Sequence, residues 1–287
     1  MIVITTPTGD IGSQVLELLA ADSEDLRVVV RDPGRLADSV RDRVDIVQGS
    51  HGDAEVVDRA FAGADAVFWL APPNPGAPSL DAMYSDFARP AARAITTHGV
   101  GHVVGVSALG RGTPVAGRAG LVTGTLAMDD LLGATGAAYR ALANPGFMDN
   151  VLRQVDSIRD EGVFTEAAIL DRPAPRVATR DIAAAAARLL SDRSWSGTST
   201  LPLLGPQDLS PQDMAGIMSE VLGRPIRCER QSYDDLSGTL SGYGAGAAFT
   251  QGMADMMRAK DDGLDAGVPR TPRQRAPRRS GSGAKKC

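Results

Sequence analysis

Aromatic residues are scarce in this sequence, at 4% of 287 residues. So small a number argues against a nucleic-acid surface built from stacking aromatic side chains. No apolar run is long enough to cross a bilayer, and no charged-then-apolar leader precedes the first expected strand. We therefore expect a cytoplasmic protein with neither a membrane nor a nucleic acid as its partner.

Cysteine is also rare, since the sequence contains Cys228 and the terminal Cys287 alone. Two cysteines form no disulfide framework and no metal-binding spacing. The three histidines, His51, His98 and His102, show no such spacing either. We therefore expect reduced cysteines and no metal site.

The charge of the chain is unevenly distributed. The formal net charge is −5, yet the stretch from Pro269 to Cys287 contains five arginines, two lysines and no acidic residue. Residues 1–268 therefore carry a formal charge of −12, which is unlike a DNA-binding surface. Residues 269–287 are rich in Pro, Arg, Ser and Gly, so we expect a disordered basic tail.

The strongest pattern lies in the first 35 residues. We expect a strand at 2–5, a helix with one apolar face at 13–21, and a second strand at 26–30 that stops at Arg31. A strand, tight turn, helix and strand within about thirty residues form the opening unit of a dinucleotide-binding fold.

The turn, Thr-Pro-Thr-Gly-Asp-Ile-Gly at 6–12, keeps the last two glycines of the usual pattern. The free N–H groups at a helix start favour a pyrophosphate. Gly9 lets the backbone approach the phosphates, and Gly12 lets the helix pack closely on the sheet. Thr6 replaces the first glycine, and its hydroxyl can donate to a phosphate. The residues expected to bind the cofactor here are Thr6, Thr8, Gly9, Asp10, Ile11 and Gly12.

Arg31 indicates which dinucleotide is bound. An acidic residue at the end of the second strand binds the ribose of NAD, whereas an arginine accommodates the 2′-phosphate of NADP. A guanidinium group suits phosphate because it donates two parallel hydrogen bonds. Arg35 lies four residues on and can add to this clamp. NADP is therefore favoured, and NAD remains the alternative because Asp32 can reach a ribose.

Strands and helices continue to alternate through the first half. We expect strands at 44–48, 66–70, 102–106 and 138–142, and helices at 55–61, 80–98 and 127–135. This order predicts an α/β, Rossmann-type doubly wound parallel sheet, with residues 1–150 as the NAD(P)-binding domain. Ligands bind at the carboxyl ends of such strands. The further cofactor-binding candidates are therefore Ser50, Ala71, Pro72, Asn74 and Asn144.

Residues 151–268 are expected to form a mostly helical substrate-binding part or lid, interleaved with the last sheet elements. We expect a helix from 151, a helix to Leu190 opened by Asp181, a strand at 200–204 and a helix at 211–222. The glycines and methionines of 234–260 suit an adaptable lid over an apolar ligand, although an ordinary core helix explains them equally well. Phe147, Met148 and Asn150 are expected to form the pocket floor.

Several stretches together resemble the NmrA-like group of atypical short-chain dehydrogenases, which includes NADPH-dependent quinone and azo-dye reductases. They include P-T-G-D-I-G at 7–12, V-V-V-R-D-P at 28–33, G-A-D-A-V-F at 63–68, V-S-A-L-G at 106–110 and T-R-D-I-A-A-A-A at 179–186. The resemblance covers most of residues 1–268. It implies NADP at the turn and at Arg31, a small C-terminal part that closes over the substrate, and a possible homodimer.

The sequence departs from this family at residues that carry chemistry. It has no Tyr-x-x-x-Lys pair and no lysine before Lys260, and Gly124-Thr125-Leu126 occupies the region where related reductases keep a lysine. Ser50 replaces the usual acid after the third strand, so the adenine contact is altered. A simple ketone leaves a basic alkoxide that needs a positioned acid, whereas a quinone leaves a stable anion. The expected substrate is therefore a quinone-like or conjugated aromatic small molecule.

Ser107 and Tyr84 are the candidate proton donors in place of the missing lysine. Ser107 ends the fifth strand, where its hydroxyl can face the nicotinamide or bond the backbone. Tyr84 can face the cleft or merely pack beside it. Asp129 and Asp130 are expected on a helix surface. A non-enzymatic redox sensor that binds NADP(H) and reports to a protein partner remains the alternative function.

Overall fold

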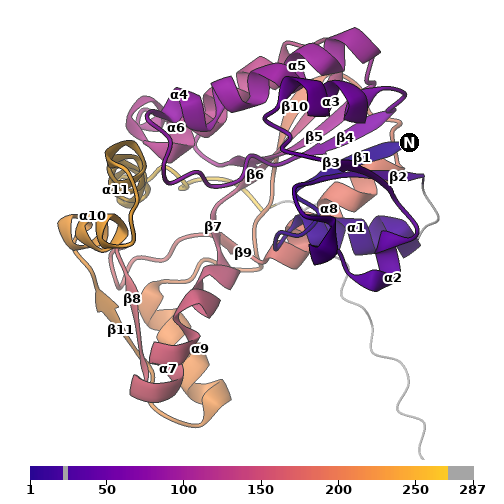
Figure 1. Ribbon diagram of the computed structural model, residues 1–287. Helices are drawn as coiled ribbons and strands as arrows, with labels where there is room; N and C mark the ends of the chain where they lie inside the picture. The colour runs from indigo at the N-terminus through magenta and orange to yellow at the C-terminus, as the bar shows by residue number, and fades with distance from the viewer. Residues whose placement is uncertain (22–24, 271–287) are drawn as a thin grey trace, which may run out of the picture.

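A seven-stranded parallel sheet forms the centre of the computed structural model, which describes residues 1–21 and 25–270 (Figure 1). Its order is β10-β6-β5-β4-β1-β2-β3. The strands are β1 (Ile2–Thr5), β2 (Leu26–Val30), β3 (Asp45–Gln48), β4 (Ala66–Trp69), β5 (His102–Ala108), β6 (Ala138–Asn144) and β10 (Thr198–Pro202). The expected doubly wound α/β fold is confirmed.

Helices cover both faces of this sheet, which explains why the inner strands are apolar throughout. Ile2 and Ile4 share a core with α1 (Gly12–Ala21) and α8 (Thr179–Ser191). Val3, which points to the other face, shares a core with α3 (Ala54–Phe61), α5 (Ser85–His98) and α6 (Leu121–Gly133). Successive side chains of one strand therefore enter two separate cores.

The strand order reverses between β1 and β4, because β2 and β3 follow on one side and β5, β6 and β10 on the other. In open α/β sheets this reversal opens a crevice at the carboxyl ends of the strands, where ligands bind. The turn after β1 and the Pro72–Pro73 segment after β4 meet there. The topology alone thus places the cofactor candidates side by side.

The second half adds a smaller layer beside the sheet (Figure 1). Its strands are β7 (Gly146–Phe147), β8 (Val163–Glu166), β9 (Arg176–Val177) and β11 (Arg227–Arg230), which pair as β7-β9 and β8-β11. Its helices are η3 (Met148–Gln154), α7 (Val155–Glu161), α9 (Pro211–Leu222), α10 (Tyr233–Gly242) and α11 (Ala247–Asp261). Short elements complete the first half: η1 (Pro33–Arg35), α2 (Asp38–Arg41), α4 (Leu80–Met83) and η2 (Ala116–Arg118).

The last helix, α11, packs against α4 and α6 of the first half. Gly120, at the start of α6, makes this approach possible. A Cβ atom there would lie 2.0 Å from the Gly252 carbonyl oxygen, and its φ of +53° is one that glycine adopts readily. The close approach brings the end of α11 to the carboxyl edge of the sheet.

Several expected boundaries were wrong. The helix at 80–98 is two helices, because Tyr84 between them has φ −122° and ψ −75°. The helix predicted at 127–135 begins at Leu121, and the strand predicted at 200–204 lies at Thr198–Pro202. The segment 234–260 forms two regular helices, α10 and α11.

Asp181 does not open α8, which begins at Thr179. Asp149 caps that helix from a distant part of the chain, since its carboxylate accepts from the Thr179 N–H at 2.8 Å and from the Thr179 hydroxyl at 2.7 Å. Such a cap joins segments 30 residues apart, so local sequence patterns did not reveal it.

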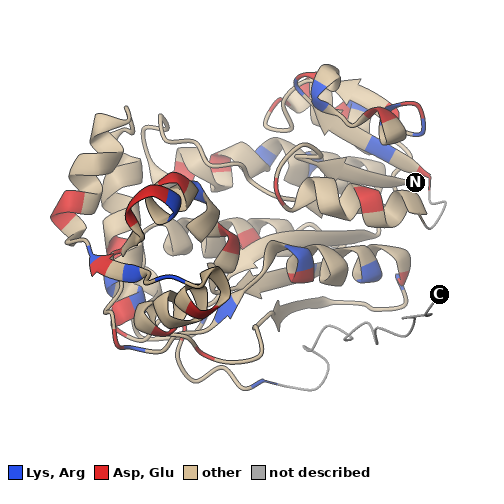
Figure 2. Cartoon of the chain, turned by 90° about the horizontal axis from the view of Figure 1, so that it is seen from below, with Lys and Arg blue, Asp and Glu red and all other residues tan. Residues whose placement is uncertain are grey.

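Acidic and basic residues are interspersed along the helices in the view of Figure 2. Among residues 1–21 and 25–270, no helix is both long and apolar enough to cross a bilayer. The expected disordered tail at 269–287 lies, from residue 271 onward, outside the described residues.

Candidate functional site

Three adjoining cavities run along the carboxyl edge of the sheet. The first, which we term the cofactor groove, has a volume of about 440 Å³ at the β1–β4 crevice. Eight of the predicted cofactor residues line it: Thr6, Thr8, Gly9, Arg31, Arg35, Ser50, Pro72 and Asn74. These residues come from four loops, and the fold brings them together.

Thr6 occupies a backbone conformation that normally belongs to glycine. Its φ is +52°, the one positive value at a non-glycine residue in the described part of the chain. A β-branched side chain in that region is strained, and such strain is characteristic of functional turns. The Thr6 hydroxyl is buried and has no hydrogen-bond partner among the described residues. It is therefore free to donate to a ligand at the turn.

Gly12 is required by the turn itself rather than by packing on the sheet. A Cβ atom at Gly12 would lie 2.1 Å from the Thr6 carbonyl oxygen. At Gly9 the nearest such contact, also with the Thr6 carbonyl oxygen, is 3.5 Å, which is ordinary van der Waals distance. The chain thus retains a glycine where the turn has no room for a side chain.

Asp10 and Ile11 do not line the cofactor groove with their side chains. Ile11 is buried in the core with α1 and α8, and Asp10 is exposed. Any contact that Ile11 makes with a phosphate would therefore come from its backbone N–H.

Arg31 and Arg35 are both exposed at the far end of the cofactor groove. His51 lies in the same groove, but it is buried edge-on against Trp69 and Phe87 and contacts the Leu70 carbonyl at 3.0 Å. Burial and, to a smaller extent, the nearby charge of Arg31 lower the pKa of His51 to about 4, although the Leu70 hydrogen bond opposes this. The neutral His51 ring therefore forms part of the wall and leaves the arginines as the cationic groups there.

The second cavity, the central cavity, has a volume of about 300 Å³. It adjoins the cofactor groove because Pro73 lines both. The predicted residues that line it are Ala71, Tyr84, Ser107, Asn144, Phe147 and Asn150. Met148, expected in the pocket floor, does not line this cavity.

Asn144 presents a free acceptor toward the central cavity. Its amide nitrogen donates to the carbonyls of Ser107 at 3.1 Å and Leu142 at 2.7 Å, which fixes the orientation of the amide. The remaining oxygen, Oδ1, is buried and has no partner among the described residues. An amide N–H of a ligand would satisfy it.

Asp129, expected on a helix surface, is instead 3% exposed and lies behind Ser107. It accepts hydrogen bonds from the hydroxyls of Ser107 and Tyr139, the latter at 2.6 Å. Burial raises the pKa of Asp129 to about 6, although both hydrogen bonds and the charge of Arg111 oppose the rise. Asp130, the adjacent residue, is exposed and pairs with Arg111 at 2.8 Å.

Tyr84 lines the central cavity together with Ser107. Its ring packs against Gly124, where a Cβ atom would lie 2.6 Å from Tyr84 Cδ2. The Tyr84 hydroxyl bonds Thr125, while burial raises the pKa of the phenol. Gly124 and Thr125 therefore accommodate a tyrosine ring in this chain.

The third cavity, the outer cavity, has a volume of about 310 Å³ and lies between the short strands β7, β8 and β9 and helices α10 and α11. Met253, Met256 and Met257 line it, as the lid hypothesis expected. Four residues line both the outer and the central cavity: Gly146, Asn150, Met256 and Lys260. The two cavities are therefore neighbouring parts of one site.

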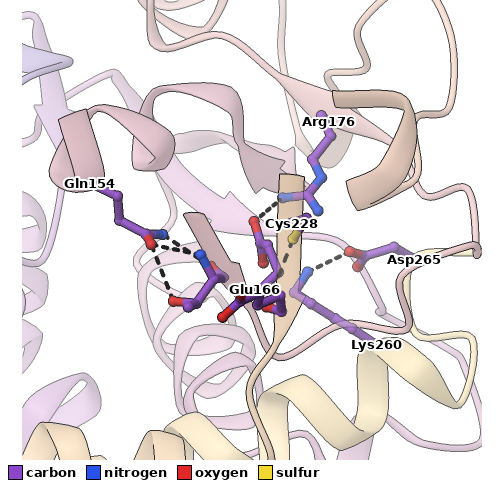
Figure 3. A network of polar contacts seen from close by, with 8 residues as sticks. Gln154, Glu166, Arg176, Cys228, Lys260 and Asp265 are labelled. Carbon is purple, nitrogen blue, oxygen red and sulfur yellow. Dashed lines mark hydrogen bonds and ion pairs between the residues drawn. The ribbon is translucent and has the colours of Figure 1, made fainter. Parts of the chain in front are cut away.

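Lys260 is the site residue that the sequence analysis missed. We looked for a lysine near Asp129, whereas Lys260 reaches the site from the end of α11. Its ammonium pairs with Asp265, as Figure 3 shows. The sequence did offer one indication of its importance, because Lys260 is the first lysine of the chain and no other occurs before residue 285.

A second ion pair lies beside Lys260 in Figure 3, between Arg176 and Glu166 at 3.2 Å. Both side chains are mostly buried, and both line the outer cavity. Cys228 lies next to them, and burial together with the charge of Glu166 raises the pKa of its thiol to about 12. A thiol so disfavoured as a thiolate is a poor nucleophile.

Comparisons with known proteins agree with this geometry. A model of an NAD(P)H-binding family matches residues 7–193. A (4-alkanoyl-5-oxo-2,5-dihydrofuran-3-yl)methyl phosphate reductase of Streptomyces griseus is 33% identical over 82% of this chain and 78% of its own length. Quinone oxidoreductase 2 of Escherichia coli is 26% identical over 93% of this chain and 89% of its own.

The same fold occurs in triphenylmethane reductase of Citrobacter sp., solved in complex with NADP(H). The TM-score is 0.76 at 20% identity, and the match covers 93% of this chain and 92% of that one. The family match and the curated relatives define a nicotinamide-dependent oxidoreductase. The chain belongs to the NAD(P)H-binding family, and it is a reductase of the atypical short-chain dehydrogenase type.

Proposed function

We propose that this protein binds NADPH along the cofactor groove and central cavity and reduces a quinone-like or otherwise conjugated small molecule held in the outer cavity. The observation that carries the proposal is the continuity of the three cavities through Pro73 and Lys260. In this proposal residues 1–150 supply the cofactor site and residues 151–268 supply much of the substrate site.

The unsatisfied groups of the site fit such a cofactor. The free Thr6 hydroxyl and the N–H groups at the start of α1 would hold the pyrophosphate. Arg31 and Arg35 would hold the 2′-phosphate, and Asn144 Oδ1 would accept from the carboxamide. When bound, the reduced nicotinamide supplies a hydride, and the protein supplies its orientation and polarity.

The substrate class is supported by the chemistry that similar proteins are named for. A dihydrofuranone, a quinone and a triphenylmethane dye all accept a hydride into a conjugated system. The methionine-rich wall of the outer cavity suits a flat, polarizable molecule of that kind.

The test is the loss of NADPH absorbance on addition of quinones, with simple aliphatic ketones as the comparison. We expect turnover with quinones and little with ketones. NADPH binding without turnover of any conjugated acceptor would instead support the non-enzymatic redox sensor.

A further inference from the structure

Lys260 stands out because it brings a charge to an otherwise neutral cavity. Among the described residues that line the central cavity, it is the one Lys, Arg, Asp or Glu. The apolar residues that line the same cavity include Val106, Leu121, Val122, Met128 and Phe147. In such apolar surroundings a charge acts strongly on the electrons of a bound molecule.

The other charges of the outer cavity have partners of their own. Glu166 pairs with Arg176, and Asp261 accepts from the Tyr233 hydroxyl at 2.5 Å and pairs with Arg230 at 3.4 Å. Arg172 donates to the Asp261 carbonyl. Lys260 differs from these groups because it lines both the outer and the central cavity.

Asp265 holds the Lys260 ammonium in position. The Asp265 side chain is 7% exposed and that of Lys260 is 19% exposed. One carboxylate oxygen of Asp265 pairs with the ammonium, while the other, Oδ1, is buried and has no partner among the described residues. The pair uses one of the three N–H donors of the ammonium, so two remain for a ligand.

We propose that Lys260 is the catalytic residue that stabilises and then protonates the oxyanion formed when a conjugated carbonyl substrate accepts a hydride. Asp265 is its positioning residue. The proposal rests on the proposed function and deepens it, because Lys260 supplies the positioned acid that the sequence analysis did not find. Conjugated carbonyls remain the favoured acceptors, since hydride addition to them leaves a more stable oxyanion than the alkoxide of a simple ketone.

The step balances as follows. Bound NADPH would supply the hydride for a C–H bond on the conjugated carbon of the substrate, and the displaced π electrons would move onto the carbonyl oxygen. An N–H bond of Lys260 breaks, an O–H bond forms, and the neutral amine regains its proton from water. The substrate gains two electrons and two hydrogens, and NADPH is oxidised to NADP⁺.

Two acceptors separate this role from a structural one. A quinone leaves an oxyanion, whereas a cationic triphenylmethane dye takes a hydride on its central carbon and becomes neutral without needing a proton. We expect Lys260→Met to lower kcat for the quinone by roughly 100-fold and to leave dye reduction within about twofold. Equal losses with both acceptors, or no loss with either, would overturn the role of Lys260.

Arg258→Met is the matched control. Arg258 lies on the same helix and carries the same charge, but it pairs with Asp255 and lines neither cavity. We expect this variant to keep both activities. A quinone-specific loss there as large as in Lys260→Met would assign the effect to the helix rather than to Lys260.

A binding measurement tests Lys260 even if no turnover occurs. In the presence of NADP⁺, the ionisation of bound 4-nitrophenol is followed by its absorbance across pH. The wild-type protein should lower the pKa of the bound phenol, and Lys260→Met should abolish that shift. Turnover failure with the shift retained would reject the proposed reductase function alone, whereas an equal shift in both proteins would reject the anion-stabilising role.

Discussion

The hydroxyl of Ser107 donates its hydrogen bond to the buried carboxylate of Asp129, which lies behind the wall of the central cavity. The hydrogen of Ser107 is therefore directed away from the cavity, and the lone pairs of its oxygen remain for a ligand. While Asp129 is ionised, Ser107 acts as an acceptor toward the site. This arrangement argues against Ser107 as the proton donor and leaves that role to a group such as Lys260.

The ionisation of Asp129 should make stability depend on pH. The fold raises its pKa from 3.8 to about 6, so the protonated form is favoured in the folded state. Its contribution to stability is fully present below pH 3.8 and is lost as pH rises through about 6. The loss should reach about 3 kcal/mol, and Asp129→Asn should remove it. Urea unfolding at a series of pH values measures both proteins.

The variant Asp38→Asn provides the control for this measurement, because the Asp38 side chain is 91% exposed and Asp38 is not among the groups that influence Asp129. Its unfolding free energy should follow the wild-type profile. The groups that face Asp129 and influence its pKa are Ser107, Tyr139, Arg111 and Asp130. Parallel profiles for wild type and Asp129→Asn would show that the carboxyl group titrates normally.

The charge at Arg31 should decide between the two nicotinamide cofactors. Arg31→Asp removes the cation at the end of β2 and adds a charge that repels a 2′-phosphate. We expect NADPH affinity to fall by about 100-fold and NADH affinity to change by less than about threefold. Fluorescence titration with each cofactor gives both values. Arg89→Asp, on the exposed surface of α5, should alter neither, and equal losses in Arg31→Asp would contradict the phosphate contact.

Replacing the two glycines of the first turn by alanine should have different effects, on stability at Gly12 and on NADPH affinity at Gly9. At Gly12 the new Cβ would lie 2.1 Å from the Thr6 carbonyl oxygen, so the turn must shift at a cost of about 3 kcal/mol. At Gly9 the protein has room, and we expect stability to change by less than about 1 kcal/mol. Gly9 lines the cofactor groove, however, so the added methyl group should lower NADPH affinity by about tenfold.

Thermal unfolding and NADPH titration of the same two variants separate these effects. A stable Gly12→Ala protein would show that the turn has more freedom than its geometry indicates. Unchanged affinity in Gly9→Ala would place the phosphates elsewhere.

Several features of the site followed from the sequence because they are local. The alternation of apolar strands with helices predicted the parallel sheet, and strand ends predicted Ser50, Ser107 and Asn144 at one edge. Thr6 was predicted in place of a glycine, and its φ of +52° shows that the turn forces the same conformation on it. The roles of these residues toward a cofactor remain predictions.

Asp129 and Lys260 could not be placed in this way. Asp129 resembles any acid on a helix until β6 supplies Tyr139 and the sheet covers its carboxylate. Lys260 lies 153 residues after Ser107 in the printed sequence, and no spacing rule connects them. Their positions depend on which helix face packs where, and this depends on contacts between distant segments.

The sequence by itself determined the fold class and the turn at the start of α1, because strand and helix periods and glycine positions act over a few residues. Only the tertiary structure decided that α11 brings Lys260 to the edge of the central cavity. The physical reason is the packing of α11 on α6 through Gly120 and Gly252, a contact between segments more than a hundred residues apart.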